Sequence, residues 1–291
     1  MRDFDEFNIT RSVIERFGNT PDPRLMQIMQ RLVQYLHDFI RDVDLTFDEW
    51  RLAIDFLTRT GQMCSDTRQE FILLSDTLGA SMLVDAINHR ARGGATETTV
   101  LGPFYVKSAP QLPDGADISG GAPGEPLYFR GSVRTTDAHP LPGALVEVWQ
   151  SDTEGYYDVQ RSDQMNLRAA FHADEKGNFS FWSIMPSCYP IPHDGPVGEM
   201  LQATNRHPYR PAHVHFMITA RGYEPVITHI FPNGDQYLDS DAVFGVKNSL
   251  ICDFRRHEPG RAPDGRIVAK PWRSLSYEFH LKAVAPSGHP Q

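Results

Sequence analysis

Two histidines two residues apart, His213 and His215, have the spacing of a metal-binding pair. They lie in the segment RPAHVHFMI at 210–218, which reads as a strand after Pro211. Because side chains alternate across a strand, both imidazoles are expected on one face. Two imidazoles on one face of a rigid strand can bind one ion. Histidines also pair by accident on protein surfaces, so this pattern needs further ligands to indicate a site.

Tyrosines in two nearby loops can supply those ligands. Tyr156 and Tyr157 follow a predicted strand that ends at Gln150, and Tyr189 lies in the proline-rich loop 185–192. A phenolate suits ferric iron, but its free pKa is about 10, so only a strong Lewis acid removes its proton at neutral pH. Two phenolates and two neutral imidazoles leave Fe³⁺ one positive charge, which one hydroxide cancels. Adjacent side chains diverge, so only one of the paired tyrosines is expected to bind.

Other kinds of site fit the same residues less well. Cys188 beside Tyr189 could bind zinc with the histidines, but no second cysteine lies near it in sequence. Cupin-type and two-histidine-one-carboxylate iron sites need an acidic residue, yet none occurs from Phe216 to Ala220. The alternative of another class is a non-catalytic β-sandwich binding module. It would scatter the tyrosines and histidines in space and be colourless, whereas a tyrosinate–Fe³⁺ protein is burgundy red.

Composition excludes several kinds of partner. The chain has 291 residues, 28 basic against 37 acidic, and a net charge of −9. This balance argues against nucleic-acid binding and against a basic membrane-binding surface. No apolar run is long enough for membrane insertion, and the acidic start resembles no secretory signal. The 3 cysteines are scattered, so no disulfide framework is expected and the protein is predicted to be cytoplasmic.

The segment before about residue 90 is predicted to be helical. Apolar residues recur at helical spacing over 25–43, and Thr46 with Glu49 forms a capping box that starts a helix ending near Gly61. A third helix is expected from about residue 66 to 89. Asp76 lies within its apolar face. It is either an exposed helix position or a polar contact at the wall of a site.

From about residue 127 the hydrophobic period becomes two. Strands are predicted at 127–135, 144–150, 178–184, 213–220, 225–231 and 275–284. Short strands separated by Gly and Pro are typical of antiparallel sandwiches and barrels. We therefore predict the α+β class, with an N-terminal helical domain over 1–97 and an antiparallel β-sandwich catalytic domain over 98–291.

Taken together, these motifs resemble the intradiol ring-cleaving dioxygenases, the catechol 1,2-dioxygenase group. The similarity covers nearly the whole chain and rests on LGPFY at 101–105, GYY at 155–157, PSCY at 186–189 and RPAHVH at 210–215. Segments 68–76, 228–231 and 237–244 are most similar to members that act on hydroxyquinol. The resemblance implies O₂-dependent cleavage of a small aromatic diol or triol. Catechol and chlorocatechols are the alternative substrates.

The resemblance also implies roles for individual residues. One Fe(III) per chain, without haem or an organic cofactor, would be bound by Tyr157, rather than Tyr156, with Tyr189, His213 and His215. Tyr189 would also accept a substrate proton, and Arg210 would stabilise negative charge on the ring. His229 stands where catechol-cleaving relatives usually have Gln, which favours hydroxyquinol and makes it a third catalytic candidate.

The implied substrate-binding wall combines apolar and small residues. Its members are Leu73, Asp76, Val100, Leu101, Gly102, Pro103, Phe104, Ile191, Pro192, Arg210 and Val243. Leu73, Val100 and Val243 fit an ordinary core equally well. The family further suggests a homodimer formed through the N-terminal helices, with a phospholipid in an apolar tunnel. Plain helix packing explains the same apolar residues.

Overall fold

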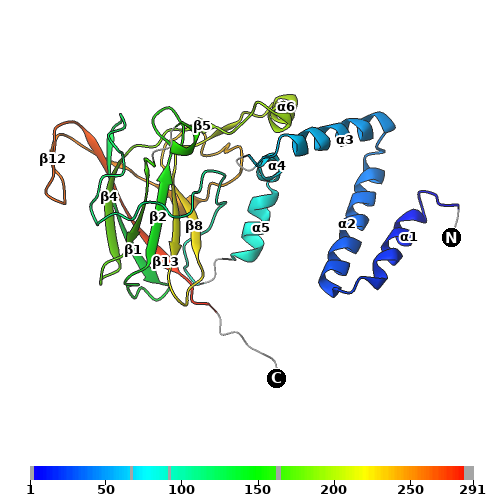
Figure 1. The fold of residues 1–291 in the computed structure, drawn as a ribbon, viewed down its shortest axis with the longest axis horizontal. Coiled ribbons are helices and arrows are strands. Elements are labelled where there is room, and N and C mark those ends of the chain that lie inside the picture. Colours follow the sequence, from blue (N-terminus) through cyan, green and yellow to red (C-terminus); the bar gives the residue numbers. More distant parts are fainter. Residues whose placement is uncertain (1–2, 66–67, 91–92, 162–164, 285–291) are drawn as a thin grey trace, which may run out of the picture. The chain divides into compact units, whose positions relative to one another are not determined.

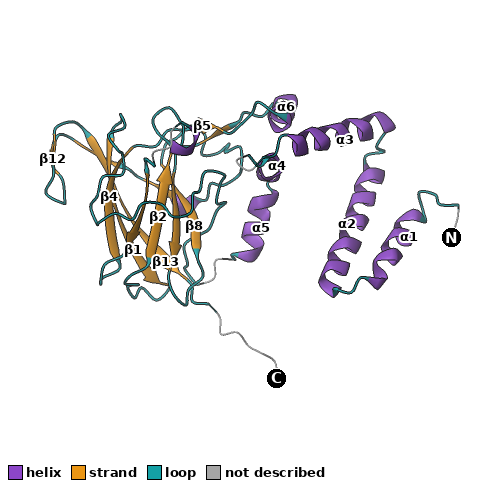
Figure 2. Cartoon of the chain, in the orientation of Figure 1, coloured by secondary structure: helices purple, strands orange, loops and turns teal. Residues whose placement is uncertain are grey.

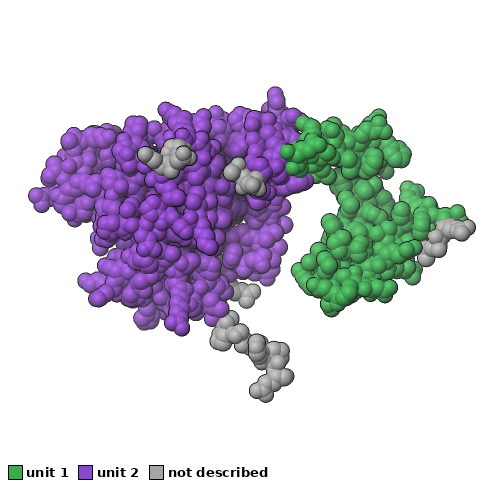
Figure 3. Space-filling view, in the orientation of Figure 1, with its two compact units in different colours: residues 1–62 green, residues 63–291 purple. Residues whose placement is uncertain are grey.

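The computed structural model describes residues 3–65, 68–90, 93–161 and 165–284 (Figure 1; Figure 2). Contacts within the chain divide it into two compact units, Met1–Gln62 and Met63–Gln291 (Figure 3). In the described residues, the first unit contains helices and no strand, and the strands lie in the second unit. Among the described residues, no helix is both long and apolar enough to cross a membrane.

Three helices and one short 3₁₀ turn form the first unit. They are α1 (Ile9–Arg16), η1 (Phe17–Asn19), α2 (Pro23–Asp42) and α3 (Phe47–Gln62). The Asp22 carboxylate caps α2 by accepting bonds from the Arg24 and Leu25 N–H groups at 2.8 and 3.2 Å. The predicted capping box of α3 is confirmed. The Glu49 carboxylate accepts from the Thr46 N–H at 2.9 Å, and the Thr46 hydroxyl accepts from the Glu49 N–H at 3.3 Å.

Helix α2 has no buried residue, and many of its apolar side chains are exposed in the described part of the chain. Its exposed large apolar side chains are Leu25, Ile28, Leu32, Tyr35, Leu36, Phe39 and Ile40. Helix α3 exposes Trp50, Leu52, Ile54 and Leu57. Exposed apolar side chains gathered on a helix are typical of an interaction site.

The second unit opens with two helices where the sequence predicted one. They are α4 (Glu70–Thr77) and α5 (Ala80–Asn88). Gly79 separates them with a φ of 73°, a left-handed conformation that cannot continue a helix. A shorter helix, α6 (Pro196–Ala203), follows later in the chain. Helical periodicity continues across Gly79, which is why the sequence pattern missed the break.

Two larger sheets form the body of this unit. The five-stranded sheet has the order β3 (Arg168–His172), β2 (Leu145–Gln150), β7 (Val214–Thr219), β8 (Val226–Pro232) and β9 (Ile251–Cys252). The four-stranded sheet has the order β10 (Arg255–His257), β13 (Trp272–Leu281), β1 (Pro126–Thr135) and β4 (Asn178–Ile184). Two short ribbons pair β5 (Tyr189–Pro190) with β6 (Tyr209–Arg210), and β11 (Gly260–Arg261) with β12 (Ile267–Val268). The remaining 3₁₀ turns are η2 (Asp158–Gln160) and η3 (Asn248–Leu250).

The α+β class is confirmed, but the expectation of purely antiparallel sheets is wrong. Strands β1 and β13 are parallel neighbours, and so are β8 and β9. The other pairs in the two large sheets are antiparallel. Apolar residues at every second position show which side chains share a face of the sheet. They do not show whether the neighbouring strand is parallel or antiparallel. The sheets are therefore mixed.

A single apolar core joins the two sheets. Phe129 of β1 lies 4.8 Å, ring centroid to centroid, from Phe216 of β7, and both rings are fully buried. Gly131 gives Phe179 room, because a Cβ at residue 131 would lie 2.1 Å from its ring. Each fully buried large apolar side chain contributes about 1.5–3 kcal/mol relative to exposure. This core keeps the strands that carry the site in fixed register.

Candidate metal centre

Four donor atoms from three segments converge in the second unit. Tyr157 Oη lies 2.8 Å from His215 Nε2 and 3.3 Å from both His213 Nε2 and Tyr189 Oη. His213 Nε2 lies 3.1 Å from His215 Nε2 and 3.4 Å from Tyr189 Oη. Ligands that share one ion through bonds of about 2 Å have this spacing. All four side chains are buried.

The strand register places the two histidines. His215 lies in β7, opposite Trp149 of β2 and His229 of β8, while His213 immediately precedes β7. His213 Nδ1 is 2.7 Å from the Pro211 carbonyl oxygen. Because a carbonyl only accepts, Nδ1 carries the hydrogen and Nε2 presents its lone pair to the cluster. The Trp149 ring stacks on His215 at 4.7 Å.

Close packing between two loops places the tyrosines. A Cβ at Gly155 would lie 2.5 Å from Tyr189 Cβ, and the φ of Gly155 is +85°, so only glycine lets the loops meet here. The Phe104 ring stacks on Tyr157 at 4.4 Å. Tyr156 is 43% exposed, and the Arg161 guanidinium lies over its ring at 3.6 Å. Tyr157, and not Tyr156, therefore joins the cluster.

Burial makes all four donors neutral when no cation is present. It lowers the pKa of His213 to about 3, and it lowers the pKa of His215 well below its ordinary value. It raises the pKa of Tyr157 well above 10 and raises that of Tyr189 as well. Desolvation penalises the charged form of each group. Neutral imidazoles are ready to bind a metal, and the phenols lose their protons only to a strong Lewis acid.

Arg210 and His229, the other two residues singled out by the sequence, lie beside the cluster. Arg210 Nη1 is 3.4 Å from His213 Nε2, and Arg210 Nη2 is 3.4 Å from His229 Nδ1. The His229 ring centroid is 4.1 Å from that of His215. Within the described part of the chain, buried His229 Nε2 and His215 Nδ1 have no hydrogen-bond partner.

A cavity of about 670 Å³ adjoins the cluster. Six predicted wall residues line it: Asp76, Val100, Leu101, Gly102, Pro103 and Phe104. A Cβ on Gly102 would lie 3.3 Å from His215 Cε1, so this wall reaches the cluster. The other predicted wall residues are not among those lining this cavity: Leu73, Ile191, Pro192, Arg210 and Val243.

Asp76 is a wall residue rather than an exposed helix position. It is 5% exposed on α4 and lines the cavity together with Ser81. Burial raises the pKa of Asp76, whereas a hydrogen bond from Ser81 and the charge of Arg210 oppose that rise. The cavity thus contains one buried carboxyl group among mostly apolar side chains.

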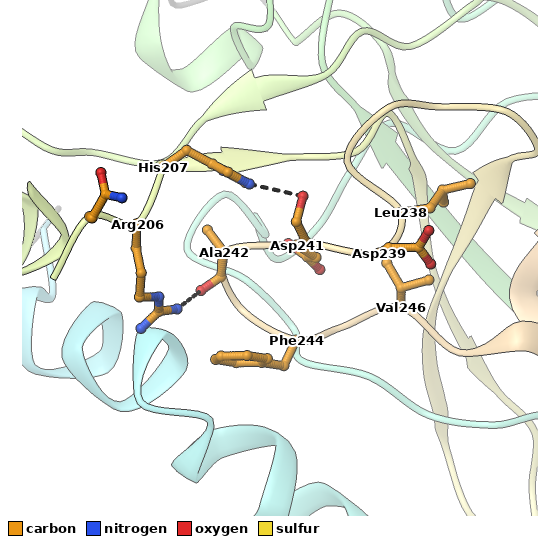
Figure 4. A pocket seen from close by; sticks show the side chains of 10 residues that line it. Arg206, His207, Leu238, Asp239, Asp241, Ala242, Phe244 and Val246 are labelled. Carbon is orange, nitrogen blue, oxygen red and sulfur yellow. Dashed lines mark hydrogen bonds between the residues drawn. The ribbon is translucent and has the colours of Figure 1, made fainter.

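A second cavity, of about 450 Å³, lies among residues 205–207 and 238–246 (Figure 4). Arg206 Nη2 donates to the Ala242 carbonyl, and His207 Nε2 contacts Ser240 Oγ at 2.9 Å. None of the four clustered donors lines it. Asp241 does line it and also pairs with Arg210. Sequence reasoning missed this pairing because the partners are 31 residues apart and no motif marks it.

A buried cluster of two tyrosines and two histidines beside a cavity has the donor set of a metal centre in an enzyme. Residues 100–283 match the family model described as Dioxygenase, and residues 22–96 match that described as Catechol dioxygenase N terminus. The chain belongs to the intradiol ring-cleavage dioxygenase family and is an enzyme.

Relatives are similar over nearly the whole chain. A 6-chlorohydroxyquinol 1,2-dioxygenase of Cupriavidus pinatubonensis is 54% identical, over 89% of this chain and 95% of its own. A hydroxyquinol 1,2-dioxygenase of Corynebacterium glutamicum is 52% identical, over 95% and 93%. The solved structure of a hydroxyquinol 1,2-dioxygenase from Pseudomonas putida has a TM-score of 0.90 at 48% identity, over 96% and 99%.

Proposed function

We propose that this protein is a hydroxyquinol 1,2-dioxygenase. It would cleave benzene-1,2,4-triol between its adjacent hydroxylated carbons and insert both atoms of O₂. Triol and O₂ together have the composition of 3-hydroxy-cis,cis-muconate, which tautomerises to maleylacetate. The observation that carries the proposal is the four-donor cluster beside a cavity with a buried carboxyl group. The relatives named above support the choice of substrate.

The proposed cofactor is one Fe(III) per chain, bound by Tyr157, Tyr189, His213 and His215, without haem or an organic cofactor. Two phenolates and two neutral imidazoles balance most of the ferric charge. When bound, the ion supplies Lewis acidity toward the two diol oxygens. The trio His213, His215 and His229 also has donor atoms within 4.8 Å of one another. The two tyrosine oxygens lie only 3.3 and 3.4 Å from His213 Nε2, however, so the set with two tyrosines is favoured.

The proposed roles of the other residues follow from their places. Tyr189 accepts a diol proton at Oη, and Arg210 beside it stabilises negative charge that develops on the ring. Asp76 accepts a hydrogen bond from the third hydroxyl group. His229 holds Arg210 from one side at Nδ1. Preorganised groups in a closed site stabilise charge more strongly than water does.

The proposed wall shapes the space for a flat ring. Val100, Leu101, Gly102, Pro103 and Phe104 line the cavity and exclude water from the ligands. We extend the wall to Leu73, Ile191, Pro192, Arg210 and Val243. The low exposure of Leu73, Ile191 and Val243 supports this extension and is equally compatible with core packing.

The test is ring cleavage by iron-loaded protein. Oxygen uptake and product absorbance would be followed with hydroxyquinol and, in parallel, with catechol, beside the visible spectrum and the iron content. We expect a burgundy protein with one iron per chain that turns over hydroxyquinol faster. Faster turnover of catechol would move the enzyme to the catechol branch. A colourless protein that is inactive on both would support the binding-module alternative.

We also propose that two domains of the chain have different roles. Residues 1–97 would form the dimerisation and linker domain and 98–291 the catalytic domain, although the compact units divide after Gln62. The exposed apolar faces of α2 and α3 support a homodimer holding a phospholipid. Light scattering would give the mass, and solvent extraction with mass spectrometry would identify the lipid. The proposed location is cytoplasmic, supported by the 3 scattered cysteines.

A further inference from the structure

One buried carboxylate holds the guanidinium of Arg210. Arg210 Nε donates to Asp241 Oδ1 at 3.0 Å, and Arg210 Nη2 donates to Asp241 Oδ2 at 3.2 Å. Both side chains are almost completely buried. Two parallel bonds of this kind fix the plane of the guanidinium as well as its place.

Asp241 is itself fixed by the backbone. Its Oδ2 accepts from the Gly245 N–H at 2.9 Å, and its Oδ1 accepts from the Val243 N–H at 3.3 Å. Burial alone would raise the pKa of Asp241, but Arg210 and these bonds lower it below its ordinary value. The carboxylate is therefore charged and has little freedom to move.

The remaining donors of Arg210 show which edge is left for a ligand. A guanidinium has five N–H donors. Nε and one Nη2 hydrogen are used by Asp241, and the second Nη2 hydrogen points to His229 Nδ1. Nη1 lies 3.4 Å from His213 Nε2, whose lone pair belongs to the metal once an ion is bound. Nη1 is then bound by neither Asp241 nor His229 and lies beside the metal centre, where Tyr189 is also a hydrogen-bond partner of Arg210.

We propose that Asp241 is a positioning residue that orients Arg210 so that Nη1 faces the substrate oxygens. The inference rests on the proposed function of Arg210 in ring cleavage. Asp241 does not touch the substrate. It fixes a buried cation that would otherwise lack its counter-charge and rotate toward other acceptors. A donor helps the reaction only when it already points to where charge develops.

Gly245 offers a second way to disturb the same pair. A Cβ at residue 245 would lie 2.9 Å from Arg210 Nη2 and 3.2 Å from Asp241 Oδ2. The φ of Gly245 is not in the left-handed region, so alanine is allowed by the backbone. Gly245→Ala should therefore displace the Arg210–Asp241 ion pair by steric contact without removing either charge.

The experiment compares iron-loaded Asp241→Asn with the wild type. We expect kcat for hydroxyquinol to fall about 100-fold, the usual effect of losing one preorganised donor. KM, iron content and the visible band should change little. The matched control is Asp85→Asn, which removes the Asp85–Lys247 ion pair (3.2 Å) outside the site. It should lose stability without losing kcat per iron.

A double-mutant cycle with Arg210→Lys tests whether Asp241 acts through Arg210. Lysine keeps the charge but cannot make the two parallel bonds of the guanidinium. In the Arg210→Lys variant, adding Asp241→Asn should lower kcat little further. Additive losses would overturn the inference, as would wild-type kcat per iron in folded Asp241→Asn. If Asp241→Asn does not fold, Gly245→Ala decides: lower kcat with retained iron supports the inference, and wild-type kcat overturns it.

The two proposals fail in different ways. If Arg210→Lys strongly lowers kcat and Asp241→Asn leaves kcat unchanged, only the positioning role is overturned. Wild-type turnover by Arg210→Lys would overturn the role of Arg210 and with it the inference. Absence of ring cleavage by the iron-loaded wild type would overturn the proposed function itself.

Discussion

Two donor atoms of the cluster lie near all of the others. Tyr157 Oη is within 3.3 Å of the other three. His213 Nε2 is within 3.4 Å of the other three. Tyr189 Oη contacts both of these atoms, at 3.3 and 3.4 Å, and Arg210 is a further hydrogen-bond partner of Tyr189. This position beside a cation suits the proposed role of Tyr189 as a proton acceptor.

Tyr189→Phe should bleach most of the visible band and nearly abolish ring cleavage. The phenyl ring keeps the packing but supplies neither the charge-transfer donor nor the proton acceptor. The visible spectrum and oxygen uptake would be measured together. Tyr156→Phe is the matched control, since that exposed side chain lies outside the cluster and should keep both signals. An unchanged spectrum in Tyr189→Phe would show that the proposed ligand set is wrong.

Asp76→Ala should weaken turnover of hydroxyquinol more than turnover of catechol. A buried carboxyl group that reads one hydroxyl contributes about 1.5–3 kcal/mol, or roughly 10- to 100-fold in kcat/KM. The ratio of kcat/KM for the two substrates is the measurement. Asp76→Asn keeps the size and a hydrogen-bond acceptor, so its ratio should lie between those of the wild type and Asp76→Ala. Equal losses on both substrates would remove Asp76 from recognition of the third hydroxyl.

At the scale of elements, the site depends on loops fixed to strands by buried contacts. Arg168 of β3 donates to both carboxylate oxygens of Asp158, at 2.7 and 2.5 Å, directly after Tyr157. The same guanidinium donates to the Phe104 carbonyl at 3.0 Å. One buried ion pair thus connects a strand, a ligand loop and the cavity wall. Removing either partner would leave a buried charge uncompensated.

Gly155→Ala should destabilise the protein and displace Tyr189. It combines a left-handed backbone with a Cβ 2.5 Å from Tyr189 Cβ. Gly143→Ala is the matched control, because its φ is +70° but nothing lies within 4 Å of its Cβ. We expect the free energy of unfolding to fall by about 1 kcal/mol in the control and by about 2–4 kcal/mol in Gly155→Ala. Denaturant unfolding gives both values, and equal losses would mean that the loop contact is unimportant.

At the scale of the whole molecule, local patterns predicted the elements and missed contacts that join distant segments. The Thr46 capping box and the six longer strands β1, β2, β4, β7, β8 and β13 were readable because their signals lie within a few residues, whereas β3 and the strands of two or three residues were missed. The parallel pairing of β1 with β13 was not, since it joins residues 146 positions apart, such as Leu127 and Arg273. The Asp241–Arg210 pair was missed for the same reason. The gathering of Tyr157, Tyr189, His213 and His215 in one cluster was predictable from the family's motifs, and the contact of Asp241 with Arg210 was not.

The proposed iron ligands all lie in the unit Met63–Gln291, so iron should stabilise that unit alone. Binding to the folded state adds stability only to the part whose unfolding releases the ion. Removing iron should therefore raise hydrogen exchange in β7 and around the β5–β6 ribbon, where His215 and Tyr189 lie, and leave α2 unchanged. Adding Fe(III) back should restore both protection and colour. Equal loosening of α2 would show instead that the helical unit unfolds together with the metal centre, and that the two compact units are one cooperative structure.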